Sequence, residues 1–258
     1  MQSLTIVKIG GNIIENEAAL QEMLTGFAAI PGAKILVHGG GRRADDICKK
    51  LDIEPQMVNG RRITDENTLE VVTMVYAGLL NKKVVSKLQA LNCNAIGLSG
   101  ADGNAILAHK RPVKDIDYGF AGDVDRVNTS LFQLLLAGRM TPVCCAITHD
   151  QKGQLLNTNA DTIASTLATG LATMFKVRLL LCFEKEGVLS NPQDDSSVIT
   201  HIYPETFEQY RADGTVSGGM LPKLENAFSA IRQGVQEVVI CGPGWFRGES
   251  KGTVLSNK

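Results

Sequence analysis

Short apolar runs alternate with longer amphipathic stretches along the whole chain. The first apolar run covers residues 4–9, and in the stretch behind it Leu20, Met23, Leu24 and Phe27 recur at the spacing of one helical face. A strand followed by an amphipathic helix, repeated along a chain, is typical of α/β proteins whose central sheet is largely parallel. We therefore expect an α/β fold.

The alternation continues to the carboxyl end and predicts most of the remaining elements. Apolar runs predict strands at residues 34–38, 95–98, 141–148, 177–183 and 237–241. Helical spacing predicts helices from the glycines after residue 38 to Leu51, and at residues 66–91, 131–137, 162–171 and 223–233.

Two segments depart from this pattern. In residues 105–127, short alternating runs flank the turn-rich residues 114–119, which predicts a β-hairpin placed to cover a ligand. Residues 190–197 are polar and rich in residues that break regular structure, and this composition predicts a solvated surface loop.

Composition and charge narrow the class of protein. The chain has 258 residues, of which 44% are hydrophobic and 21% charged, so it can bury one large α/β core or two lobes that share a sheet. Its net charge of −1 argues against nucleic acid as the main partner, because phosphate binding usually requires a clear basic excess. Any basic site must therefore be local.

The chain shows no sign of a membrane or secretory segment. No apolar stretch approaches the ~18 residues needed to cross a bilayer, and the run at residues 4–9 is interrupted by Lys8, unlike a signal peptide. Cys144, Cys145, Cys182 and Cys241 lie in apolar, strand-like runs without zinc-site spacing. We expect them to pack in the core of a cytoplasmic protein kept under reducing conditions.

Glycines follow both of the first two predicted strands. Gly10 and Gly11 follow the first, and residues 39–41 are all glycine after the second. Ligands bind at this edge of open α/β sheets, where glycine backbones and helix amino termini accommodate phosphate or carboxylate groups. Tight turns alone would explain one such loop, but two favour an anion-binding cradle.

Known nucleotide-binding fingerprints fit the glycines poorly. Residues 39–44 have the glycine spacing of a dinucleotide-binding loop, but the acidic residue expected about 20 positions later has no matching context. The sequence contains no P-loop motif. An oxidoreductase that binds a dinucleotide is therefore a distant alternative.

Two lysines stand in unusual positions. Lys8 lies in an otherwise apolar strand, directly before the first glycine pair. Lys223 follows Pro222, which is tolerated in a helix only in its first turn, so Lys223 lies near a helix amino terminus where a cation is unfavourable. Both positions make sense if an anion binds beside them.

Two further polar motifs have open interpretations. Asn159 or Asp161 suits the start of the helix that follows, yet a buried Asp161 carboxylate would also suit the two lysine ammoniums. Arg61 and Arg62 stand in a predicted polar turn before a helix, either as surface charge or as a carboxylate clamp.

Together, these motifs resemble the amino acid kinase family over essentially the whole chain. The resemblance is carried by five segments in the family's order and spacing: Lys8-Ile-Gly-Gly11, His38-Gly-Gly-Gly41, Asn59-Gly-Arg-Arg-Ile-Thr64, Asn157-Thr-Asn-Ala-Asp161 and Gly219-Met-Leu-Pro-Lys223. It implies an open αβα sandwich of the carbamate kinase type, in which residues of about 1–170 bind an acyl amino acid and mediate dimerisation. Residues of about 171–258 would then form an ATP-binding lobe.

The resemblance also implies an activity and a set of site residues. The activity would be transfer of a phosphoryl group from ATP, with Mg²⁺, to the γ-carboxylate of an N-acyl-L-glutamate, an early step of arginine biosynthesis. The acyl group is acetyl by default, with succinyl as an alternative. The implied residues are Lys8, Lys223 and Asp161 in catalysis, Gly40, Gly41, Arg62 and Asn157 for the acyl amino acid, and Gly10, Gly11, Gly187, Val188, Thr215, Ser217 and Gly219 for the nucleotide. No protein ligand for a metal is implied.

The chain departs from the family at residues 182–188, where Cys-Phe-Glu-Lys-Glu-Gly-Val replaces the usual Ser/Thr-Asp-Val-x-Gly-Val/Ile pattern. The first strand begins almost at Met1, without the amino-terminal helix of the hexameric relatives that arginine inhibits. We therefore expect a homodimer that arginine does not inhibit. Alternatives are a family kinase acting on glutamate, aspartate, carbamate or UMP, or a non-catalytic sensor of an amino acid or nucleotide.

Overall fold

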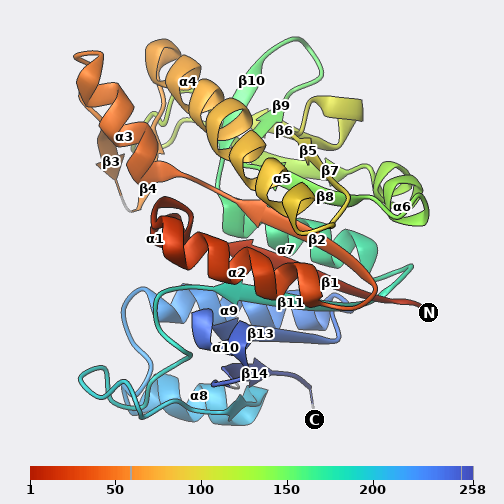
Figure 1. Ribbon diagram of the computed structural model, residues 1–258. Coiled ribbons are helices and arrows are strands. Elements are labelled where there is room, and N and C mark those ends of the chain that lie inside the picture. The colour runs from red at the N-terminus through yellow and green to blue at the C-terminus, as the bar shows by residue number, and fades with distance from the viewer. Residues whose placement is uncertain (59, 251, 258) are drawn as a thin grey trace.

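A computed structural model describes residues 1–58, 60–250 and 252–257 of the chain (Figure 1). Asn59, the first residue of one family motif, lies outside the described residues. Elements far apart in the sequence, such as β1 (Ser3–Ile9) and β11 (Lys176–Cys182), are neighbouring strands of one central sheet.

The central sheet has eight strands among the described residues. Their order is β12 (His201–Ile202), β14 (Thr253–Leu255), β13 (Glu237–Cys241), β11, β1, β2 (Ala33–His38), β8 (Thr141–Cys145) and β5 (Ala95–Leu98). Neighbours pair in parallel except β13 and β14. The prediction of an α/β fold with a largely parallel sheet is confirmed.

Helices cover both faces of the sheet. On one face lie α2 (Glu17–Ala29) and α5 (Asn81–Ala90), and on the other lie α7 (Ala160–Leu171) and α9 (Met220–Arg232) (Figure 1). The apolar stripe of α2, with Phe27 fully buried, packs into the core as the periodicity predicted. Each such buried side chain stabilises the fold by about 1.5–3 kcal/mol relative to an exposed one.

Shorter helices complete these layers. They are α1 (Gly11–Glu15), α3 (Gly41–Lys50), α4 (Glu66–Thr73), α6 (Thr129–Ala137), α8 (Pro204–Ala212) and α10 (Pro243–Arg247), with a 3₁₀ turn at Asp102–Asn104. The helix predicted at residues 66–91 is present as α4, a π-helical segment at Met74–Leu80, and α5.

The predicted hairpin is present and belongs to a small barrel. Strands β6 (Ile106–Lys110) and β7 (Ala121–Val127) are antiparallel, and β9 (Ile147–His149) and β10 (Leu155–Thr158) close the barrel with them. The single strand predicted at residues 141–148 was wrong, because the chain leaves the central sheet after β8 and enters the barrel as β9. A continuous apolar run does not reveal which of two sheets each half joins.

The expectation of a polar turn at Arg61 and Arg62 was also wrong. Both arginines lie in β4 (Arg61–Ile63), which pairs with β3 (Gln56–Val58) in a two-stranded sheet. Three-residue strands carry too few positions for a periodic pattern to be visible.

The parallel register brings several strand ends to one edge. Ile9 pairs with His38 on one side and Cys182 on the other, and Cys182 pairs with Cys241. Four chain segments therefore leave the sheet side by side, each followed by a loop or helix start. This edge is where ligands bind in open α/β sheets.

Candidate active site

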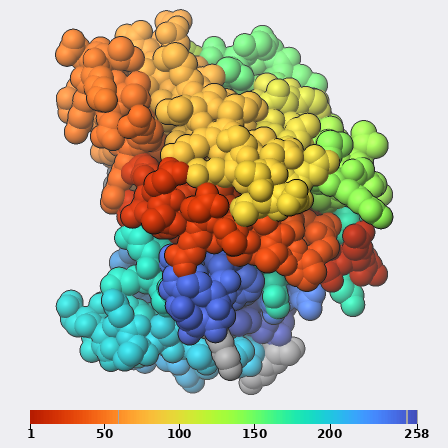
Figure 2. Space-filling view, viewed as in Figure 1, coloured from red at the N-terminus to blue at the C-terminus, as the bar shows by residue number. Residues whose placement is uncertain are grey.

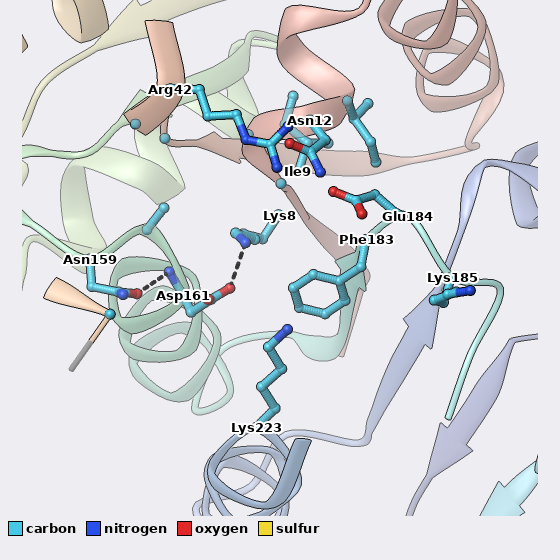
Figure 3. Close-up of a pocket in the computed structure, with 18 of the residues that line it drawn as sticks. Lys8, Ile9, Asn12, Arg42, Asn159, Asp161, Phe183, Glu184, Lys185 and Lys223 are labelled. Carbon is cyan, nitrogen blue, oxygen red and sulfur yellow. Dashed lines mark hydrogen bonds and ion pairs between the residues drawn. The ribbon is translucent and has the colours of Figure 1, made fainter. Parts of the chain in front are cut away.

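A cavity of 620 Å³ opens at this edge of the sheet. It lies between the two glycine loops and the segment after β11. In the space-filling view the surface is hollowed on the left, between the orange atoms around α3 and the cyan atoms around α8 (Figure 2). Lining side chains include Lys8, Asn12, Arg42, Asp161, Phe183, Glu184 and Lys223 (Figure 3).

Lys8 and Asp161 form an ion pair in this cavity. The Lys8 side chain, near the end of β1, is buried, and its Nζ lies 2.9 Å from Oδ1 of Asp161. Asn159 caps α7, because its Oδ1 accepts hydrogen bonds from the backbone N–H groups of Asp161 and Thr162 at 2.8 and 3.2 Å. Asn159 thus takes the capping role and leaves the Asp161 carboxylate for the lysine.

Lys223 reaches the same cavity from the first turn of α9. The helix begins at Met220, three residues earlier than the sequence predicted, with Pro222 in its first turn. Nζ of Lys223 lies 3.6 Å from the ring centroid of Phe183. Burial lowers the pKa of Lys223, Asp161 raises it, and the neighbouring ammonium of Lys8 lowers it.

The two glycine loops border the cavity in different ways. Gly10 donates its N–H to the carbonyl of Cys182 at 3.1 Å, so this amide is used by the sheet edge rather than left for an anion. Gly40 has φ +153°, and a Cβ there would lie 2.2 Å from Cδ1 of Leu80, so this turn requires glycine. Gly11 and Gly41 also line the cavity.

A second cavity of 190 Å³ adjoins the first at the Gly40 loop. Arg62 and Asn157 both line it. Arg62 is buried, pairs with the carboxylate of Asp45 and donates to the Gly41 carbonyl at 3.0 Å. Asn157 donates to the Thr64 hydroxyl at 3.0 Å. The four residues expected to bind the acyl amino acid therefore come together.

A third cavity, of 220 Å³, lies beside the segment after β11. Gly187, Val188, Thr215 and Ser217 line it, and Gly187 also lines the first cavity. Gly219 lines none of the three cavities and stands directly before α9. The structure thus groups most of the residues expected at a nucleotide, and Gly219 stands next to Met220, which lines the first and third cavities.

Residues 182–188, which diverge from the family pattern, contain two side chains that the sequence did not single out. The Phe183 ring contacts both lysines, since Nζ of Lys8 lies 4.8 Å from its centroid. Glu186 accepts the N–H of Gly244 at 3.0 Å, which ties the segment to the start of α10. In the sequence, only the departure of residues 182–188 from the family pattern pointed to this segment. No spacing rule links residue 183 to residues 8 and 223.

The described residues form neither the ligand cluster of a metal site nor a membrane-spanning helix. Among the residues described, no three or more His, Cys, Asp or Glu side chains gather in an arrangement able to hold a metal ion. Nor does the described part of the chain contain a helix both long and apolar enough to span a bilayer. The six cysteines are buried and unpaired in disulfides.

Comparison with known proteins identifies the family. The model of the amino acid kinase family matches residues 3–242. A protein named acetylglutamate kinase from Phocaeicola vulgatus is 55% identical over 254 residues, 98% of each chain. A second protein of that name, from Bacteroides thetaiotaomicron, is 57% identical over 239 residues, 93% of each chain.

Solved structures agree on the fold. Carbamate kinase from Giardia lamblia bound to AMP-PNP superimposes with a TM-score of 0.70 at 12% identity, covering 100% of this chain and 99% of that one. At this identity the likeness establishes the fold alone. With the family model matching nearly its whole length, the chain belongs to the amino acid kinase family.

Proposed function

We propose that this chain transfers the γ-phosphoryl group of ATP to the γ-carboxylate of an N-acyl-L-glutamate, giving an acyl phosphate and ADP in arginine biosynthesis. The observation that carries the proposal is 55–57% identity, over 93–98% of the chain, to relatives named acetylglutamate kinase. The geometry is consistent with it, because two lysines and one carboxylate meet in a cavity that adjoins a second, arginine-bearing cavity.

Charge stabilisation is the chemistry that this site supports. Phosphoryl transfer to a carboxylate needs no protein nucleophile, because the substrate carboxylate attacks the phosphorus directly. The ammoniums of Lys8 and Lys223 would stabilise negative charge on the transferring group and on the oxygen that leaves with ADP. Asp161 holds Lys8 in place through the 2.9 Å ion pair. Mg²⁺ bound to the ATP phosphates would neutralise part of their charge.

The second cavity is the proposed subsite for the acyl amino acid. Arg62 would bind the α-carboxylate with its guanidinium, a planar fork that matches a carboxylate in two parallel hydrogen bonds. One guanidinium nitrogen of Arg62 pairs with Asp45, and the other donates to the Gly41 carbonyl. Asn157 and the backbone of Gly40 and Gly41 line the same space and would position the rest of the substrate.

The nucleotide is proposed to extend from the first cavity into the third. Gly187 lines both, and Val188, Thr215 and Ser217 line the third. This arrangement would assign residues of about 171–258 to ATP and residues of about 1–170 to the acyl amino acid. The two would meet where Lys8 and Lys223 face each other across the strand ends.

A substrate panel tests the proposal. We expect ATP-dependent ADP release with N-acetyl-L-glutamate or N-succinyl-L-glutamate, and kcat/KM at least ~10²-fold lower with L-glutamate, L-aspartate, carbamate or UMP, which lack matching groups. The ratio of the two acyl substrates identifies the acyl group. A preference for one of the other acceptors would assign a different kinase activity, and no ADP release with any acceptor would favour a sensor.

We further propose that the enzyme is a cytoplasmic homodimer. Met74 and Leu79, on the long helical run, are large apolar side chains that remain half exposed, as expected near a subunit interface. Light scattering of the purified protein should give twice the chain mass.

A further inference from the structure

Lys8 and Lys223 are two of the lysines that line the candidate active site, and Asp161 is the carboxylate that pairs with one of them. Asp161 pairs with Lys8, whereas no carboxylate of the described residues lies within ion-pairing distance of Lys223. Burying an ammonium without a partner is unfavourable, and a second ammonium nearby adds repulsion. Asp161 attracts the Lys223 ammonium only from beyond ion-pairing distance, so the groups in direct contact with Lys223 bear on how it is held toward the cavity.

The phenyl ring of Phe183 is the group that Lys223 contacts. The lysine Nζ lies 3.6 Å from the ring centroid, and Nζ of Lys8 lies 4.8 Å from the same centroid. In Figure 3 the ring stands beside both ammonium groups, across from the Asp161 carboxylate. A cation within about 6 Å of an aromatic face is attracted by the ring's quadrupole.

The backbone around Phe183 fixes where this ring stands. Phe183 comes directly after β11, and its N–H donates to the carbonyl of Cys241 in the neighbouring strand at 2.9 Å. On the other side, the carbonyl of Cys182 accepts the N–H of Gly10 at 3.1 Å. The ring is half-buried and lines the cavity. Its position is therefore tied to the same strand ends that carry Lys8.

An aromatic ring attracts an ammonium without carrying a negative charge, whereas a carboxylate carries one. A second carboxylate would neutralise the second ammonium and repel the phosphates of the nucleotide. A ring attracts the ammonium while leaving its full charge to an incoming phosphoryl group. The site can thus keep both lysines charged with Asp161 as the carboxylate that pairs with Lys8.

We propose that Phe183 is a positioning residue whose ring holds Lys223, and secondarily Lys8, at the place of phosphoryl transfer in lieu of a second carboxylate. The inference rests on the proposed function, because it assumes that both lysines act on the phosphoryl group. It also gives a role to residues 182–188, where the chain departs from the family pattern.

The charged groups that face Lys223 determine how its protonation responds to loss of the ring. They are the carboxylates of Asp161 and Glu184, which favour the ammonium, and Lys8, which opposes it. Replacing the ring by an apolar side chain of similar size takes away the aromatic attraction, while most of the burial and the repulsion by Lys8 stay in place. The pKa of Lys223 should then fall, and the alkaline limb of the rate profile should move to lower pH.

The test compares Phe183→Leu and Phe183→Met, which keep an apolar side chain, with Phe183→Tyr, which keeps the aromatic face. We expect kcat/KM to fall ~10-fold in the first two variants, with the alkaline limb moved to lower pH, and to change less than ~3-fold in the third. Using two non-aromatic variants keeps the test informative if one of them folds poorly, which a thermal melt reveals.

A second readout does not depend on activity. The protein is labelled with ¹³C at the lysine ε-carbons, and the Lys223 resonance is assigned from its disappearance in Lys223→Arg. We expect this resonance to titrate at lower pH in Phe183→Leu than in the parent protein, and at nearly the parent pH in Phe183→Tyr.

Two results would overturn the inference. One is parent-like kcat/KM and Lys223 titration in Phe183→Leu and Phe183→Met. The other is an equal loss of rate in all three variants with an unchanged Lys223 titration, which would make the ring a packing element only. Either result leaves the proposed function standing, because that function fails only if the parent protein does not phosphorylate an N-acyl-L-glutamate.

Discussion

Lys8 and Lys223 meet at one cavity in different environments, one paired with a carboxylate and one beside an aromatic ring. The sequence singled out both lysines, because a cation is unfavourable where each local pattern puts it, whereas Asp161 suits a helix start and its catalytic role was implied by the family resemblance. It did not predict Phe183, since an aromatic residue after a strand is ordinary until its neighbours in space are known. A charged residue in a locally unfavourable position can be recognised in the sequence alone. A favourable contact between residues far apart in the chain cannot, because the sequence does not show which residues meet.

Asp161→Asn should distinguish the proposed catalytic ion pair, Lys8 with Asp161, from ion pairs on the surface. The substitution removes the charge that holds Lys8, and we expect kcat to fall ~10²-fold or more. Glu17→Gln is a matched control, because Glu17 also pairs with two lysines, Lys83 and Lys87 at 2.5 Å each, but on the exposed surface. The measurement is steady-state kinetics of both variants, with melting temperatures to check folding. Equal rates in the two variants would contradict a catalytic role for Asp161.

His38 should make stability depend on pH. It is fully buried, its Nδ1 donates to the Gly39 carbonyl at 2.8 Å, and its Nε2 accepts from the Asn81 amide at 3.1 Å. Burial lowers the pKa of His38 to about 4 from an ordinary 6.5, so the unfolded chain takes up the proton first. The contribution of neutral His38 is complete above pH 6.5 and is lost as pH falls toward 4, a change of about 3 kcal/mol.

Denaturant unfolding between pH 7 and pH 4 measures this effect. The parent protein should lose more free energy of unfolding over that range than His38→Asn, which has no titrating ring and retains a donor near Gly39. Parallel curves for the two proteins would show that His38 does not titrate as its burial implies.

At the scale of elements, the helical run from α4 to α5 shapes the Gly40 turn. Leu80 ends the π-helical segment and packs against Gly40, and Tyr76 lies beside it. The sequence predicted one helix over residues 66–91 but not the π-helical segment, because a change in hydrogen-bonding pattern leaves the apolar spacing almost unaltered. The short strands β3, β4 and β14 were missed because three residues carry no readable period.

Gly40→Ala should therefore damage both the fold and the acyl-amino-acid subsite. The φ of Gly40 is +153°, and a Cβ there would lie 2.2 Å from Cδ1 of Leu80. We therefore expect the variant to lose ~2–4 kcal/mol of stability and to have a raised KM for the acyl amino acid. Gly78→Ala is the control, since no atom lies within 4 Å of a Cβ at that helical position and alanine favours helices. Equal stability and KM in the two variants would contradict this account of the turn.

At the scale of the whole molecule, the parallel sheet brings motifs that are far apart in the sequence to one edge. The pairing of β1 with β2 and β11 brings residues 8, 38 and 182 to neighbouring positions, and α7 and α9 start at the same edge. The sequence predicted strands followed by glycines, and the general rule placed ligands at that edge. The order of the strands, and hence which loops become neighbours, required the structure and the family relationship.

Trapping the product tests most directly whether this chain makes an acyl phosphate from ATP and an N-acyl-L-glutamate. The protein is incubated with ATP, Mg²⁺, N-acetyl-L-glutamate and hydroxylamine, which converts an acyl phosphate into a hydroxamate. We predict hydroxamate formation by the parent protein and by Glu17→Gln, and a loss of ~10²- to 10⁴-fold in Lys8→Met and Lys223→Met. No hydroxamate from the parent protein, or undiminished formation by both lysine variants, would contradict the account.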